Sequence, residues 1–206
     1  MRPLALGLGL SIGILGSLDI AVSTAAPAAA AGRQSVADHQ NGFAFELPPG
    51  WHKVSLNKKN LGAALDAAKK LSPALRSALT TEVQSATTSG ITLFAFSSAA
   101  INGFLPNVNV GVYPTPATLS QLQATATEQL TEIGGKNVTA QVTQFRHITA
   151  VEATYVLPLK DQSSVYGTQV YVSHGGKTYV ITFTSASVRI EAMAASASMA
   201  TWHFIN

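Results

Sequence analysis

Apolar and polar residues alternate along much of the chain after residue 41, and this alternation predicts a series of β-strands. The segment Phe43-Ala44-Phe45-Glu46-Leu47 has a period of two, which is typical of a strand with one buried face. Pro48-Pro49-Gly50 ends it, because proline cannot donate to a strand ladder and glycine permits a turn. Further strands are expected at residues 51–56, 91–96, 107–113, 138–147 and 151–159, and on both sides of Gly175-Gly176.

In the strand at 107–113, the valines at 108, 110 and 112 are expected to point inward, and Asn107, Asn109 and Gly111 outward. The strand at 91–96 is apolar on both faces, so we expect it inside a sheet.

Helical spacing of apolar residues predicts three helical segments. The first covers residues 61–83, with a break and restart at Ser72-Pro73. The second runs from 119 to 133: Thr118 and Gln121 form a capping box before it, and Gly134-Gly135 ends it. Ser187 caps the third, which is expected to bury Ile190, Met193, Ala194 and Ala197.

Two hairpins are expected in the second half of the chain. A two-residue turn at Gly175-Gly176 places Val172 opposite Tyr179, Val170 opposite Ile181 and Thr168 opposite Phe183. All the large apolar side chains then fall on one face, and this agreement supports the register. The other hairpin is expected to turn at Thr149-Ala150.

Hairpins dominate this order of elements, so the sheet is expected to be largely antiparallel. Several strands are apolar on more than one face, and amphipathic helices must therefore cover the sheet. The predicted fold class is α+β, an α/β/α sandwich with the sheet in the middle.

Residues 1–31 differ from the rest of the chain. Arg2 precedes an uncharged run from Leu4 to Leu18, and residues 25–31 are nearly all alanine. This pattern predicts a secretory signal peptide, and the run is shorter than the ~20 residues of a membrane span. We expect residues 32–41 to be a mobile arm and 42–206 a single domain. The protein is then secreted or extracytoplasmic, and it is held at a membrane only if the leader stays uncleaved.

Composition removes several classes of function. The chain has no cysteine, which excludes disulfides, thiol nucleophiles and a lipoprotein anchor. Its 206 residues carry a net charge of only +3, too little and too dispersed to predict binding to nucleic acid.

Four segments resemble the PsbP-like superfamily in order and spacing. Residues 43–51 are similar to its first hairpin, residues 104–110 to its central strand, residues 169–183 to its last hairpin, and Thr201-Trp202-His203-Phe204 to its closing segment. This superfamily includes an extrinsic subunit of plant photosystem II, a Ran-binding nuclear import factor and exported LpqN-type lipoproteins of actinobacteria. The resemblance implies a fold and a non-catalytic, partner-binding role, and it implies no substrate.

Candidate chemistry is sparse. With the turn at Thr149-Ala150, His147 would face Glu152. The pair could be half of an acid–base site or a weak metal site, or an exposed cross-strand pair, which we favour. No catalytic, cofactor-binding or metal-ligating set is predicted.

The sequence thus favours an exported, non-enzymatic domain that binds a protein or a cell-envelope component. The alternative is a carrier of an apolar or lipid-like ligand, held between the sheet and the helices at 61–83. Its candidate ligand-facing residues are Phe94, Phe96, Leu65 and Leu75.

Overall fold

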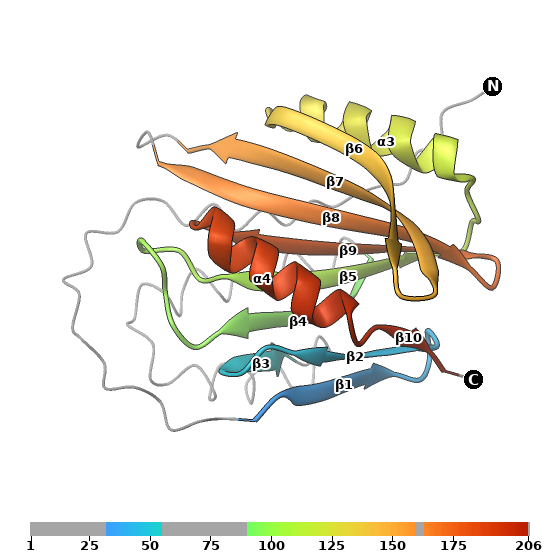
Figure 1. Ribbon diagram of the computed structural model, residues 1–206, viewed down its shortest axis with the longest axis horizontal. Coiled ribbons are helices and arrows are strands. Elements are labelled where there is room, and N and C mark those ends of the chain that lie inside the picture. Colours follow the sequence, from blue (N-terminus) through green and yellow to red (C-terminus); the bar gives the residue numbers. More distant parts are fainter. Residues whose placement is uncertain (1–31, 55–89, 160–162, 206) are drawn as a thin grey trace.

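The computed structural model describes residues 32–54, 90–159 and 163–205. Within these ranges the chain forms two antiparallel sheets and two helices (Figure 1). The expected helices at 61–83 and the leader lie outside the described residues. None of the helices in the described ranges is long and apolar enough to cross a membrane.

The larger sheet has seven strands, and every neighbouring pair is antiparallel. In spatial order they are β3 (Trp51–Val54), β4 (Ile91–Ser97), β5 (Asn107–Tyr113), β9 (Lys177–Ser185), β8 (Ser164–His174), β7 (Ile148–Pro158) and β6 (Lys136–Phe145). β4 is inside this sheet, as its two apolar faces predict.

The two helices cover opposite faces of this sheet (Figure 1). Helix α3 (Leu119–Glu132) packs Leu122, Ala126 and Leu130 against the β6–β8 region. Helix α4 (Val188–Met199) packs against β2, β8 and β9. The sheet therefore has two hydrophobic cores, one beneath α4 (the α4 core) and one beneath α3 (the α3 core). Successive residues of β8 point into different cores: Val170 and Val172 lie in the α4 core, and Tyr171 lies in the α3 core. The α+β fold class with a central antiparallel sheet is confirmed.

The second sheet contains three strands, β1 (Gln34–Asp38), β2 (Phe43–Leu47) and β10 (His203–Phe204), with β2 in the middle. Residues 34–38 are therefore a paired strand rather than the mobile arm that we expected. Val36 is buried in the α4 core opposite Phe45, and all five residues of the strand are paired with β2.

β2 and β3 do not pair with each other, although the sequence resemblance suggested a hairpin. Pro48-Pro49-Gly50 instead carries the chain from the small sheet into the large one. The Trp51 amide donates to the Pro48 carbonyl at 3.2 Å, and Gly50 has a φ of 78°, a conformation that favours glycine.

The capping box and the Gly-Gly hairpin are confirmed in detail. Thr118 and Gln121 satisfy each other's backbone donors at the start of α3. Gly175 and Gly176 both have positive φ, and the predicted partners of Thr168, Val170 and Val172 are the observed ones.

The β6–β7 hairpin differs from the expected one. It turns at Arg146-His147, with Arg146 at a φ of 51°. This register pairs Phe145 with Ile148 and lets both pack against the α4 core, where Ala150 is completely buried. A turn at Thr149-Ala150 would remove Ala150 from that core.

An aromatic cluster closes the domain over the small sheet. The rings of Phe43 and Trp202 stack with centroids 4.8 Å apart, and Phe45 and Tyr179 flank the same indole. The Tyr179 hydroxyl donates to the Asn41 carbonyl at 2.8 Å.

Candidate functional site

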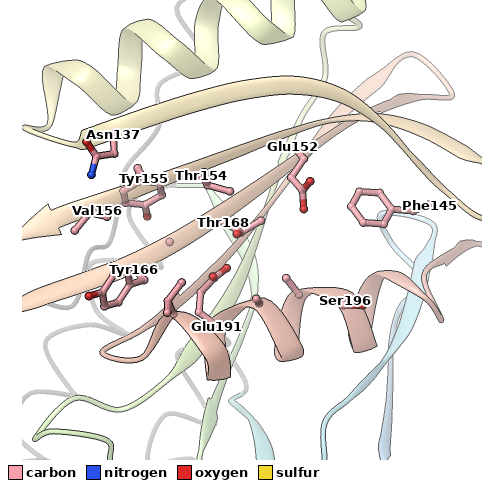
Figure 2. Close-up of a pocket in the computed structure, with 14 residues that line it drawn as sticks. Asn137, Phe145, Glu152, Thr154, Tyr155, Val156, Tyr166, Thr168, Glu191 and Ser196 are labelled. Carbon is pink, nitrogen blue, oxygen red and sulfur yellow. The ribbon is translucent and has the colours of Figure 1, made fainter.

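A cleft of about 430 Å³ lies between helix α4 and strands β7 and β8, with β6 at its edge (Figure 2). Its lining includes the even-numbered residues 152, 154 and 156 of β7 and 166 and 168 of β8. Two cross-strand pairs, Thr154 with Thr168 and Val156 with Tyr166, make up much of its sheet side, and the Tyr155–Gly167 pair lies between them.

The cleft has a buried floor and an open rim. Glu191, Thr168 and Ala195 are buried, whereas Thr154, Ala192 and Ser196 are exposed. Val188 at the start of α4 is 59% exposed although it is apolar. A molecule from solvent can therefore reach a polar floor past a partly apolar rim.

Glu191 is the most unusual residue of this floor. It is 5% exposed, and among the described residues its Oε1 has no hydrogen-bond partner. An unsatisfied buried polar group costs about 1–3 kcal/mol, and a charged one more. Figure 2 shows its side chain directed from α4 toward Thr168 on the sheet. A buried side chain that carries this energetic cost on the floor of a cleft is a candidate for binding a ligand.

The pKa of Glu191 is raised from 4.5 to about 7, mainly because burial disfavours the charged carboxylate. A hydrogen bond with the Thr168 hydroxyl lowers this pKa, and the nearby Glu152 carboxylate raises it by a smaller amount. Both protonation states of Glu191 are thus accessible near neutral pH.

Glu152 reaches the same cleft from β7 and is half-buried (Figure 2). Its partners in the ladder are Gln141 and Val170. The predicted pairing of His147 with Glu152 is therefore wrong: His147 occupies the hairpin turn, five positions from Glu152 along the chain, while Gln141 takes the facing position.

Phe94 and Phe96 are both buried, on the face of β4 opposite Leu93 and Ala95. Their cross-strand neighbours are Asn109 and Asn107, which are buried rather than pointing outward as expected. The ladder continues this face through Thr182 and Gln169.

Gln169 accepts a hydrogen bond from the Tyr171 hydroxyl and donates to Thr182 at 3.2 Å. The face that carries both phenylalanines is thus partly polar in the described region. Leu65 and Leu75 lie outside the described residues, and the carrier hypothesis stays a prediction.

Helix α4 is rotated relative to the expected orientation. Met193, expected in the core, is 56% exposed, and Ile190 and Ala197 are only half-buried. The buried positions are Glu191, Ala194, Ala195, Ser198 and Met199. In a segment this rich in alanine the apolar stripe is weak, and the observed rotation buries Met199. Glu191 was missed for this reason.

Within the described ranges, no three residues of the types His, Cys, Asp and Glu come together as a metal site would need. His174 stacks on Phe204 with centroids 3.7 Å apart, and His52 lies beside Phe96. Among the described residues, Arg33 and Glu46 form an ion pair on the surface, with 3.1 Å between Nη1 of the arginine and Oε2 of the glutamate.

Comparison with solved structures identifies the fold as PsbP-like. PsbP (CyanoP) of Synechocystis sp. PCC 6803 matches with a TM-score of 0.51 and 14% identity, over 89% of this chain and 98% of that one. LpqN of Mycobacterium tuberculosis, described as involved in cell envelope biogenesis, matches with a TM-score of 0.51 and 8% identity, over 85% and 91%. No family model and no curated protein matches the sequence.

Proposed function

From the PsbP-like fold, we propose that this chain is an exported, non-enzymatic domain that binds a protein or a component of the cell envelope. The observation that carries the proposal is the likeness to LpqN across most of both chains. Residues 1–31, with the composition of a signal peptide, support export independently of the fold.

The side-chain arrangement supports a binding role rather than catalysis. The histidines of the described ranges lie outside the cleft lining, where they contact aromatic rings, occupy turns or bond to the backbone. The cleft instead combines two carboxylates, hydroxyl groups and apolar surface. Such a mixture can hold and orient a ligand.

Affinity capture from an envelope extract of the natural host tests the proposal. Residues 32–206 with a C-terminal tag should retain a specific protein or envelope component, and the tag alone should not. Capture should be lost when the domain is thermally unfolded before use. If nothing is retained above the tag-only control in repeated extracts, the partner-binding proposal fails.

A further inference from the structure

The α4–β7–β8 cleft contains two carboxylates and no described group that neutralises them. Glu191 lies on its floor and Glu152 on its wall, and neither is in an ion pair with a described residue. Within the described chain, its lining includes no lysine, arginine or histidine. Buried charges in proteins are normally paired, so this cleft is complementary to a cation.

The unpaired Oε1 of Glu191 is an independent sign of a missing partner. Its residue is buried, the side chain points into the cleft, and this oxygen accepts no hydrogen bond from the described residues (Figure 2). Three elements contribute oxygen-bearing side chains to the lining of the cleft, namely Glu191 from α4, Glu152 from β7 and Thr168 from β8, and the Thr168 hydroxyl is hydrogen-bonded to Glu191.

The one unpartnered oxygen of Glu191 suits an ammonium group, which is a compact charge with three donors around one nitrogen. A guanidinium group presents a planar fork that pairs best with both oxygens of one carboxylate, and Glu191 already has a hydrogen bond with Thr168. A calcium ion takes six to eight oxygen ligands, more than two carboxylates and a hydroxyl supply.

The rest of the lining suits an aliphatic stem attached to that nitrogen. Val188, Ala192 and Ala195 supply apolar surface from α4, and Phe145 supplies a ring at the edge of β6. Long amines bury their methylene groups along such surface while the charge reaches a polar site.

We infer that this cleft binds a primary ammonium group carried on an aliphatic stem, paired with Glu191 and Glu152. The inference rests on the proposed binding function and specifies the chemistry of the partner. The group can come from a lysine side chain of a protein or from a free aliphatic amine.

Titration followed by ¹H–¹⁵N NMR tests the inference with residues 32–206. The probes are Nα-acetyl-lysine methylamide, its Nε-acetylated form, the matching arginine compound and 1,5-diaminopentane. The lysine compound or the diamine should shift amide signals of residues 187–196 and 152–156. The Nε-acetylated form, which lacks the charge, should not, and the arginine compound should bind more weakly. Tighter binding by the lysine compound than by the diamine assigns the site to a protein partner, and the reverse order assigns it to a free amine.

Two variants and a matched control locate the binding. Glu191→Gln should weaken binding by about ten-fold or more, and Glu152→Gln should weaken it less, since that residue is half-buried. Glu128→Gln, on the exposed face of α3, should leave it unchanged. The native amide spectrum of each variant verifies folding.

The inference is overturned if neither amine shifts these signals at millimolar concentration, if the arginine compound binds more tightly, or if folded Glu191→Gln binds like the wild type. Such results would not contradict the proposed partner binding, because the partner could bind to another surface of the domain. Conversely, amine binding without any captured partner contradicts the proposed function and not the cleft.

Discussion

Gly167 stands opposite Tyr155 in the β7–β8 ladder, and the tyrosine ring fills the space that a side chain at residue 167 would occupy. A Cβ added at Gly167 would overlap the Cζ, Cε1 and hydroxyl of Tyr155. The ring is buried in the α3 core, so it cannot swing into solvent. This pair fixes the sheet beneath one end of the cleft.

Gly167→Ala should therefore lower the free energy of unfolding by about 1–3 kcal/mol, because overpacking forces buried neighbours to shift. Gly32→Ala is the control, since a Cβ there meets nothing within 4 Å. Urea unfolding measures both variants. Adding Tyr155→Leu to Gly167→Ala should recover part of the loss, and strictly additive effects would contradict the proposed overlap.

Glu191 should make stability fall as pH rises through neutrality. Its pKa is about 7 in the folded protein against 4.5 ordinarily, so between these values the folded state binds more protons than the unfolded state. Stability then decreases with increasing pH across this window. The cost of ionisation is complete above about pH 7 and absent below pH 4.5.

Glu191→Gln removes this ionisation. At pH 8 the variant should be more stable than the wild type by about 1–2 kcal/mol, a value reduced for partial solvent screening. At pH 4.5 the two should be nearly equal. Urea unfolding at several pH values, with Glu128→Gln as control, measures the difference. A difference that does not change with pH would rule out titration of Glu191 as its cause.

Val36 tests whether residues 34–38 belong to the folded domain. Because this side chain is buried in the α4 core, Val36→Ala should lower the free energy of unfolding by about 1–2 kcal/mol. Ser35→Ala, at the exposed neighbouring position, should change it little. Equal effects of the two substitutions would indicate that residues 34–38 are a mobile arm after all. Rapid hydrogen exchange along the whole strand would indicate the same.

The capping box of α3 makes a separate prediction. Thr118→Ala removes the acceptor of the Gln121 amide and should lower the free energy of unfolding by about 1 kcal/mol. The control is Thr127→Ala, at an exposed position inside the same helix, where the hydroxyl only bonds back to the Gln123 carbonyl. It should be neutral or slightly stabilising, because alanine is the better helix former. Thermal unfolding compares them, and the opposite order would show that the cap contributes nothing.

The parts of the fold that the sequence predicted correctly are those where several local signals agree. At Gly175-Gly176 the turn residues and the apolar partners on both strands select one register. At Arg146-His147 the turn has no glycine, so its position depends on packing Phe145, Ile148 and Ala150 into a distant core. Local patterns do not contain that information.

The candidate site was harder to predict for a related reason. Helix α4 is alanine-rich, so its apolar side is weakly marked in the sequence, and Met199 and Trp202 are buried in one core with Ala194 and Ala195. A buried glutamate contradicts the usual placement of charge on the outside, so no pattern in the sequence singled out Glu191. The cleft appears only when β7, β8 and α4 are brought together.

The position of β10 has a consequence for how the chain is made. β2 pairs on one side with β1, only a few residues away, and on the other with residues 203–204. The Phe43–Trp202 stack also joins two segments that are far apart in the sequence. The small sheet and its aromatic cover therefore cannot be completed until residue 204 has left the ribosome.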